Sequence, residues 1–370
     1  MTFAIIYDCI YPYTKGGVEK RIFEMTRRLN RTRQIHIFTM KFWNGEKLKK
    51  ESNITYHGIC RPFNLYSPSG KRRIYPAIHF SILLLFALFK QAPDILDCQN
   101  IPYIPSLACK LYCFIKKKPL VITWHEVWGN YWYRYLGWKG FFGKLIEKLT
   151  AKFSNYNIAG SYKTASRLQR ISDKPITLIP LGVDIERIER TKPSLEQFDI
   201  LFVGRLIPEK NVEMLIRIVA EIEIENVLCG IIGDGPFKRH LERVANERRV
   251  SDKIRFLGFV DDVYPYMKSS KIFVFPSVRE GFGIVVIEAN ASGLPVVVLA
   301  HPNNAATELI KNGKNGFICK NEAEMTERTI QLLTDENLRK AQSRYARTSA
   351  EKYSWDKIVE EYERFITELV

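Results

Sequence analysis

The sequence predicts an α/β protein made of two doubly wound domains, in which parallel strands alternate with helices. Its 370 residues exceed what a single hydrophobic core usually organises, so two domains are expected. The composition, with 46% hydrophobic and 26% charged residues, is that of an ordinary folded protein. Short apolar runs of strand length alternate with stretches of helical periodicity along the chain, which is the pattern of parallel-sheet domains.

The first domain is expected to span residues 1–184. Its first strand, at residues 3–7, leads through a loop into an amphipathic helix at residues 18–29. Gly16 and Gly17 stand just before this helix, where glycines allow a phosphate to reach the amide groups of a helix N-terminus. A plain tight turn is the alternative reading. Further strands are predicted at residues 35–39, 54–56, 95–98, 120–123, 156–161 and 177–184.

A charged linker at residues 185–197 separates this domain from a second one at residues 198–352. The last segment, residues 353–370, has the periodicity of an amphipathic helix. Within the second domain, strands are predicted at residues 200–204, 227–232, 255–259, 272–275 and 296–298. Gly233 begins a glycine loop directly after the second of these strands.

Two basic residues follow the first strand of the second domain. Arg205 and Lys210 lie on a loop that leads into a helix starting near Asn211. Arg binds phosphate oxygens by forked hydrogen bonds and Lys acts as a point charge, so two cations beside a helix N-terminus suit a diphosphate. The alternative is a pair of exposed basic residues on a turn.

Two glutamates lie in one strand-loop-helix unit further along. Glu280 is in the loop after the strand at residues 272–275, and Glu288 is about one turn into a helix at residues 284–291. Helical side chains lean toward the helix N-terminus, so both acids can address one ligand at the carboxyl end of the strand. Carboxylates accept from hydroxyls and glycine-loop amides face oxygens, so a sugar beside a phosphate would suit this lining. A chance meeting of two surface acids is the alternative.

These residues resemble the paired-glutamate signature of family 4 glycosyltransferases, which are retaining enzymes with the GT-B fold. The sequence reads Phe-Pro-Ser-x-x-Glu-Gly-Phe-Gly from Phe275 and Ala-x-Gly-x-Pro-Val from Ala291. Gly-Arg-Leu-x-x-x-Lys-Asn from Gly204 resembles the donor-phosphate motif of the family. The resemblance covers nearly the whole chain. It implies two Rossmann-like domains facing a central cleft, with the C-terminal helix crossing back to the first domain.

The resemblance implies a hexosyltransferase that moves a sugar from a UDP- or GDP-linked donor to a glycan or lipid-linked acceptor. The first domain would bind the acceptor and the second the nucleotide sugar. No cofactor and no metal are implied, and the sequence contains no Asp-x-Asp. The implied catalytic residues are His125, Arg205, Lys210 and Glu280. The implied donor-binding residues are Gly16, Gly17, Arg205, Lys210, Gly233, Glu280, Gly281, Phe282, Gly283 and Glu288.

One segment departs from the family pattern. Relatives commonly place a glycine pair before the glutamate that stands here as Glu308, whereas this chain has Asn303, Asn304 and two alanines. Asparagine tolerates unusual backbone angles, so a similar loop is expected.

The basic charge is concentrated in the first half of the chain. Residues 1–190 carry 31 Lys and Arg against 13 Asp and Glu, and residues 191–370 carry 25 against 27. The apolar run at residues 77–89 is shorter than the roughly 18 residues of a membrane span. Four tryptophans lie within residues 124–138, and a basic amphipathic helix follows them up to residue 153. Together with the apolar run, these features predict peripheral contact with an anionic membrane through residues 61–90 and 128–153. A core helix with solvated lysines is the alternative.

Other partners and functions remain open at this stage. Nucleic acid also favours basic, aromatic surfaces, but no recognition motif is present, and we expect none to bind. A non-catalytic subunit that binds a nucleotide sugar, or a phosphorylase-like GT-B enzyme, would share the same motifs. The odd number of seven cysteines and the strand at the N-terminus predict a cytoplasmic protein without a signal peptide, peripheral on the inner face of the membrane. The base, sugar and acceptor are not readable from the sequence.

Overall fold

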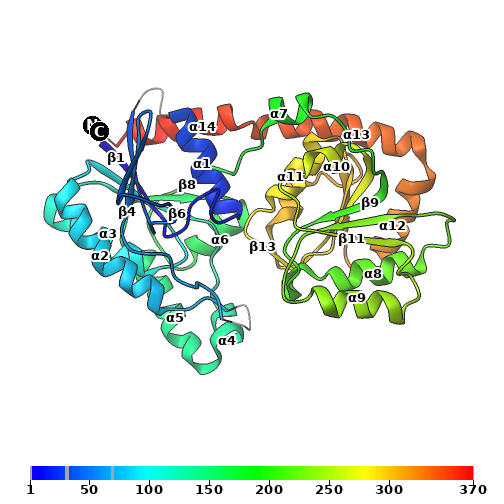
Figure 1. Ribbon diagram of the computed structural model, residues 1–370, viewed down its shortest axis with the longest axis horizontal. Helices are drawn as coiled ribbons and strands as arrows, with labels where there is room; N and C mark the ends of the chain where they lie inside the picture. Colours follow the sequence, from blue (N-terminus) through cyan, green and yellow to red (C-terminus); the bar gives the residue numbers. More distant parts are fainter. Residues whose placement is uncertain (1, 30–32, 68–70, 370) are drawn as a thin grey trace. The chain divides into compact units, whose positions relative to one another are not determined.

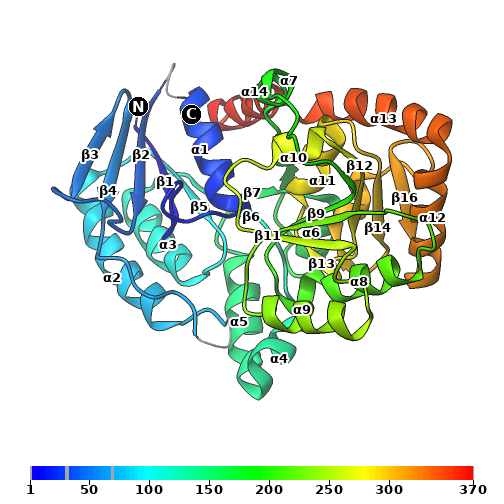
Figure 2. The same ribbon diagram turned by 45° about the vertical axis from the view of Figure 1, so that its right-hand side comes forward.

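The computed structural model describes residues 2–29, 33–67 and 71–369, and its chain divides into two compact units (Figure 1). Unit 1 comprises Met1–Leu181 together with Trp355–Val370, and unit 2 comprises Gly182–Ser354. Each unit contains a largely parallel sheet covered by helices, as Figure 2 shows from a second side. The predicted α/β architecture of two doubly wound domains is confirmed.

The sheet of unit 1 has the strand order β3-β4-β2-β1-β5-β6-β7-β8. Its strands are β1 (Thr2–Ile6), β2 (Gln34–Thr39), β3 (Leu48–Glu51), β4 (Ile54–Gly58), β5 (Ile95–Gln99), β6 (Leu120–Trp124), β7 (Tyr156–Ala159) and β8 (Ile176–Leu178). Only β3 among them is antiparallel to its neighbour. The sequence did not predict β3, because its Leu-Lys-Lys-Glu run is polar and mostly exposed and therefore carries no hydrophobic period.

The helices of unit 1 come from both ends of the chain. They are α1 (Gly17–Leu29), α2 (Tyr75–Gln91), α3 (Ile104–Lys116), α4 (Tyr131–Leu136), η1 (Gly137–Lys139), α5 (Gly140–Thr150), α6 (Tyr162–Gln169) and α14 (Trp355–Thr367). The last of these runs beside α1, where Arg28 Nε donates to Asp356 Oδ1 at 2.9 Å (Figure 1). Tyr362 of α14 also donates its hydroxyl hydrogen to Asp97 in β5. The C-terminal helix is therefore an integral part of unit 1.

The sheet of unit 2 is entirely parallel and has the order β11-β10-β9-β12-β14-β16. Its strands are β9 (Phe198–Val203), β10 (Cys229–Ile232), β11 (Ile254–Gly258), β12 (Ser270–Phe275), β14 (Val296–Leu299) and β16 (Gly316–Cys319). Residues 272–275 of β12 are all fully buried, as expected of a central parallel strand covered on both faces.

The helices of unit 2 are α7 (Ile185–Arg190), η2 (Pro208–Lys210), α8 (Val212–Glu221), α9 (Lys238–Glu247), α10 (Tyr264–Lys268), α11 (Ile284–Ala291), η3 (Ala305–Leu309), α12 (Glu322–Thr334), α13 (Glu336–Ala350) and η4 (Glu351–Tyr353). The first of these lies in the segment expected to be a linker. Its N-cap Asp184 accepts from the amide of Arg187 at 3.0 Å, so a local capping bond starts a helix within a charged run.

No helix in the described part of the chain is both long and apolar enough to cross a membrane.

Candidate functional site

The carboxyl edge of the unit 2 sheet contains a point where the strand order reverses. In chain order the strands lie 3-2-1-4-5-6, so β9 and β12 are neighbours whose following loops turn to opposite sides. Ligands of open α/β sheets bind at such a switch point. The loop after β9 carries Arg205 and Lys210, and the loop after β12 carries Glu280. The three charged residues predicted from the sequence therefore leave adjacent strands at the same edge.

Lys210 and Glu280 form an ion pair between these two loops. The two side chains are 18% and 11% exposed, so the pair is largely shielded from solvent yet reachable. The ammonium of Lys210 also lies 5.3 Å from the ring centroid of Phe275, at the end of β12. A cation and a carboxylate are thus held side by side at the switch point, within reach of a single ligand.

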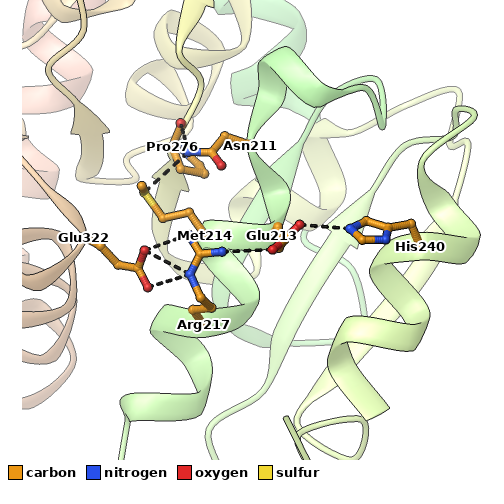
Figure 3. A network of polar contacts seen from close by, with 7 residues as sticks. All are labelled: Asn211, Glu213, Met214, Arg217, His240, Pro276 and Glu322. Atoms are coloured by element: carbon orange, nitrogen blue, oxygen red, sulfur yellow. Dashed lines mark hydrogen bonds and ion pairs between the residues drawn. The ribbon is translucent and has the colours of Figure 1, made fainter. Parts of the chain in front are cut away.

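Hydrogen bonds between the two loops fix this pair. Asn211 adopts the left-handed conformation with a φ of 52° and donates its side-chain amide to the Pro276 carbonyl at 3.3 Å (Figure 3). The carbonyl of Glu209 accepts from the amide of Val278 at 2.9 Å and from the hydroxyl of Ser277 at 3.1 Å. The residues flanking Lys210 are therefore tied to those preceding Glu280.

A polar network braces helix α8, which begins directly after this loop (Figure 3). Arg217 donates to both carboxylate oxygens of Glu322 at 2.7–3.0 Å and to Glu213 at 3.1 Å, and the hydrogen bond to Glu322 raises the pKa of Arg217. Glu213 also contacts His240 Nε2 of α9 at 2.9 Å. The network joins α8 to α9 and to the start of α12. Glu213 and Arg217 have the i,i+4 spacing of a helical ion pair, but His240 and Glu322 are distant in the sequence, so spacing gave no signal for those two contacts.

The glycines of unit 2 have a packing role that the sequence analysis did not foresee. A Cβ on Gly233, whose φ is 144°, would lie 1.9 Å from the carbonyl oxygen of Gly204. A Cβ on Gly235 would lie 2.3 Å from the carbonyl oxygen of Leu206. The amide of Leu206 in turn donates to the Asp234 carbonyl at 2.9 Å. The loops after β9 and β10 therefore pack backbone against backbone, which only glycine permits at these positions.

Glu288 is 3% exposed on α11 and accepts from the hydroxyl of Tyr264 at 3.1 Å. Helix α11 starts after Gly283, whose φ is 92° and whose added Cβ would lie 2.6 Å from the Cβ of Ala306. This close approach joins the Glu280 loop to the segment at residues 303–309. Phe282 of the same loop is 7% exposed and meets the ring of Tyr353 edge to face.

The asparagines that replace the expected glycine pair do not act through unusual backbone angles. The backbone of Asn304 has an ordinary φ of −104°. Its buried side chain donates to the carbonyls of Ser277 and Leu299 at 2.9 and 3.0 Å and accepts from the amide of Ala306 at 3.0 Å. Residues 303–304 also pair as strand β15 with Arg279–Glu280, strand β13. Hydrogen bonding, rather than conformational freedom, therefore explains Asn304.

Unit 1 repeats the strand order around β1 and β5, with β4-β2-β1-β5-β6-β7 as its central six strands. His125 follows β6, and its Nε2 lies 3.0 Å from Oε1 of Gln99 at the end of β5. Burial, aided by the positive charge of Arg21, lowers the pKa of His125 to about 3. The imidazole is therefore neutral at physiological pH. Gln99 was not predicted, although its place at a strand end was a usable signal.

The loop around Gly16 and Gly17 holds a carboxylate of the chain itself. A Cβ on Gly16 would lie 2.5 Å from Oε2 of Glu19, which sits in the first turn of α1. Burial raises the pKa of Glu19. Nearby in the sequence, both carboxylate oxygens of Asp8, at the end of β1, accept from Arg72 at 2.7 Å. The sequence analysis missed Glu19, Asp8 and Arg72.

Comparison with known proteins follows the division into two units. A family model described as Glycosyltransferase Family 4 matches residues 15–187, and one described as Glycosyl transferases group 1 matches residues 184–349. The chain belongs to the GT4-type glycosyltransferases. Solved GT-B structures share its fold. Sucrose-phosphate synthase from Thermosynechococcus elongatus superposes with a TM-score of 0.85 at 17% identity, covering 100% of this chain and 98% of that one. Anabaena HepE in complex with UDP-glucose gives 0.79 at 17% identity with full coverage of both.

Two enzymes are described here from among the relatives of this GT4-type chain that have named reactions. A Campylobacter jejuni enzyme, N-acetylgalactosamine-N,N'-diacetylbacillosaminyl-diphospho-undecaprenol 4-alpha-N-acetylgalactosaminyltransferase, is 32% identical over 201 residues, 53% of this chain and 54% of the relative. The alpha-monoglucosyldiacylglycerol synthase of Acholeplasma laidlawii is 25% identical over 250 residues, 60% of this chain and 62% of the relative. The chain spans about half the length of the curated relatives it matches.

Proposed function

We propose that this chain transfers a sugar from a nucleoside-diphosphate sugar to an acceptor hydroxyl with retention of the anomeric configuration. The observation that carries the proposal is the Lys210–Glu280 ion pair at the switch point of unit 2. Glu280 would accept hydrogen bonds from sugar hydroxyls while Lys210 faces the diphosphate. Glu288, one turn into α11, would accept from the ribose hydroxyls.

The chemistry follows from where charge develops. When the bond between the sugar and the diphosphate breaks, positive charge grows on the sugar and negative charge on the leaving diphosphate. Arg205 and Lys210 would stabilise that negative charge by preorganised electrostatics. We propose front-face transfer, in which the leaving phosphate oxygen accepts the proton of the acceptor hydroxyl as the new glycosidic bond forms. Nucleoside diphosphate and glycoside are then the only products.

A thermal-shift panel of UDP-, GDP- and ADP-sugars tests the donor site. A donor at one hundred times its dissociation constant stabilises the fold by about 2.7 kcal/mol. A nucleotide sugar that shifts unfolding and is then consumed only when an acceptor is present supports the proposal. A shift without transfer would favour the non-catalytic binding subunit, and turnover that requires inorganic phosphate would favour a phosphorylase. No shift with any donor would overturn the donor site.

We propose that the acceptor is lipid-linked or close to a membrane, and that the protein works peripherally at the inner face of that membrane. Among the relatives with named reactions, the Campylobacter jejuni transferase and the Acholeplasma laidlawii synthase are named for lipid-linked or lipid substrates, whereas a Bacillus anthracis relative is named for L-malate. Helix α5 supplies the physical support, because its outward side is apolar. Phe141, Phe142, Leu145 and Leu149 are 55%, 61%, 45% and 48% exposed, whereas the helix buries Gly140, Gly143, Glu147 and Thr150.

Helix α2 presents a second exposed apolar row. Its outward side chains are Tyr75, Ile78, Ile82, Phe86 and Phe89. The segments at residues 61–90 and 128–153 together contain ten Lys and Arg and a single acidic residue, Glu147, which is buried. Exposed apolar side chains flanked by basic ones match an anionic lipid surface in both hydrophobicity and charge.

Vesicle sedimentation tests this part of the proposal. Binding to vesicles rich in phosphatidylglycerol that weakens with added salt, without binding to a single-stranded oligonucleotide, is the expected result. Absence of vesicle binding would remove the membrane contact and leave the donor site untouched.

A further inference from the structure

Glu147 is the one acidic side chain in the segment at residues 128–153, and it is fully buried. It lies on the inward side of α5, opposite the exposed row that includes Phe141 and Leu145. Burying a carboxylate in a small helical subdomain is costly unless its oxygens are hydrogen-bonded. The hydrogen-bond partners of Glu147 therefore indicate its structural role.

Both oxygens of Glu147 hold other parts of unit 1. Oε1 accepts from the backbone amide of Trp128 and from the hydroxyl of Tyr103, each at 2.7 Å. Oε2 accepts from the backbone amide of Gly129, also at 2.7 Å. Burial raises the pKa of Glu147 while these bonds oppose that rise. The carboxylate thus fastens α5 to Tyr103, the residue before α3, and to the loop that follows β6.

That loop begins with His125. His125 bonds to Gln99, and Trp128 at the other end of the loop donates its indole hydrogen to Glu126 at 3.2 Å. The ring of Trp128 packs on those of Trp132 and Tyr135, with centroids 4.5 and 5.0 Å apart. The position of residues 125–129 is therefore set at one end by the sheet and at the other by Glu147 and the aromatic rings of α4.

The aromatic cluster of Trp128, Trp132 and Tyr135 is also connected to the end of β1. The hydroxyl of Tyr135 accepts from the backbone amide of Arg72 at 2.6 Å, and Arg72 holds the carboxylate of Asp8. Contacts thus run without interruption from α5 to the loops at the carboxyl ends of β6 and β1.

Helix α5 packs so closely on Trp132 that it cannot shift without moving the aromatic cluster of Trp128, Trp132 and Tyr135. A Cβ on Gly143 would lie 2.3 Å from the ring of Trp132, and one on Gly140 would lie 2.3 Å from its carbonyl oxygen. The two glycines let α5 pack directly on α4, so a force on the outward side of α5 reaches Trp132 and Trp128 through rigid contact.

We propose that Glu147 is a positioning residue that fixes the loop at residues 125–129 and couples it to the outward apolar face of α5, so that contact with an anionic membrane alters the loop that carries His125. This inference rests on the proposed membrane contact and acceptor role of unit 1. It identifies Glu147 and the contacts through which lipid binding at α5 would alter the loop at the carboxyl edge of that unit.

Hydrogen exchange of the full chain, with and without vesicles of phosphatidylglycerol and phosphatidylcholine, tests the coupling. In the natural protein, vesicles are expected to change amide exchange in the peptide containing Trp128 and Gly129. Glu147→Gln is expected to bind the vesicles as before, but with exchange in this peptide about tenfold faster, the order expected when hydrogen bonds to a charged group are lost, and no longer responsive to vesicles. Replacing Phe141 and Phe142 by serine should weaken vesicle binding, and with it the vesicle response, and leave lipid-free exchange unchanged.

Glu24→Gln provides a matched control, because Glu24 is another buried glutamate of unit 1 and pairs with Arg28 within α1. It should keep the vesicle response. If Glu147→Gln does not fold, Tyr103→Phe removes one of the bonds to Glu147 and should weaken the response in the same direction. A natural protein whose loop ignores vesicles, or a Glu147→Gln variant that responds like the natural protein, overturns the coupling. Donor-induced thermal shifts are measured separately, so failure of the donor site is distinguishable from failure of this inference.

Discussion

The two units share the same central strand order but differ in what their helices expose. Of the 24 large hydrophobic side chains that are exposed among the described residues, 21 belong to unit 1 and three, Leu195, Phe259 and Tyr345, to unit 2. Both units have a topological switch point, between β1 and β5 in one and between β9 and β12 in the other. The sheet is therefore a common scaffold, and the helical layer distinguishes the units.

Charge follows the same division. The surplus of basic residues lies within residues 1–190, while residues 191–370 are nearly balanced. In unit 2, basic and acidic groups are paired in specific contacts, as in Lys210–Glu280 and Arg217–Glu322. Unit 2 thus holds charged groups at the edge of its sheet, whereas the basic surplus lies with unit 1, for which we propose contact with an anionic surface.

The largest expected effect concerns the ligand site of unit 2. Lys210→Ala and Glu280→Ala should each raise the barrier to sugar transfer by about 2–4 kcal/mol, the scale of losing one preorganised electrostatic contact. Initial rates of nucleoside diphosphate release with a matched donor and acceptor measure this.

Lys271→Ala is the control, because Lys271 forms an ion pair with Asp199 at 2.7 Å near the start of β12, away from the carboxyl edge, with its side chain more exposed than that of Lys210. It should leave transfer unchanged. Near-normal turnover in both site variants would discard the assignment of unit 2 as the donor site.

Much of unit 2 was predictable from the sequence because its signals are local. The helix at Ile284–Ala291 and the buried strand before it follow from apolar runs bounded by glycines, and the charged loops follow directly on strand ends. The bonds from Arg217 to Glu322 and from Asn304 to Ser277 were not predictable, since these partners are distant in the chain. Position after a strand can be read from one sequence, whereas the partner of a side chain cannot.

In unit 1 the sequence predicted the elements better than their orientation. The amphipathic pattern of α5 is normally a sign that the apolar side faces a core. Here the two glycines and Glu147 face inward, because Trp132 occupies the space that larger side chains would need. The lysines and tryptophans favoured an interfacial helix over a core helix, and the packing shows that the apolar side of α5 is exposed.

The second prediction addresses the apolar surface of unit 1. Replacing Phe141 and Phe142 together by serine should weaken binding to phosphatidylglycerol vesicles by about 2–3 kcal/mol. A phenylalanine contributes roughly 1.5–3 kcal/mol when its whole side chain leaves water, and only 55% and 61% of these two side chains are exposed. Sedimentation at constant salt measures the loss. Phe259→Ser removes a phenylalanine of similar exposure, 56%, from unit 2 and should not alter binding. Equal losses in both variants would contradict a specialised surface on unit 1.

The third prediction concerns the reason the apolar side of α5 faces outward. Gly143→Ala should lower the free energy of unfolding by about 1–3 kcal/mol, because the new methyl group would overlap the ring of Trp132 and force it to shift. Chemical denaturation followed by tryptophan fluorescence measures the change. Gly17→Ala is the control, since its nearest neighbour would be an ordinary contact at 3.8 Å. A Gly143→Ala variant as stable as the control would show that the glycine face is not tightly packed.

The smallest expected effect is a pH dependence of the free energy of unfolding that is due to His125, at the carboxyl edge of the unit 1 sheet. Burial lowers the pKa of His125 to about 3, while an unfolded histidine has a pKa of about 6.5. Below pH 6.5 the His125 ring therefore binds a proton in the unfolded chain but not in the folded chain. The free energy of unfolding then falls as the pH falls. Between pH 7 and pH 6 this amounts to about 0.7 kcal/mol, and His125→Gln should remove it. Parallel denaturation curves of both proteins measure the difference, and NMR should show no titration of the His125 ring above pH 5. A ring that titrates near pH 6.5, or identical pH slopes for the two proteins, would mean that His125 is open to water, and the neutral hydrogen bond to Gln99 would then not define this edge of the sheet.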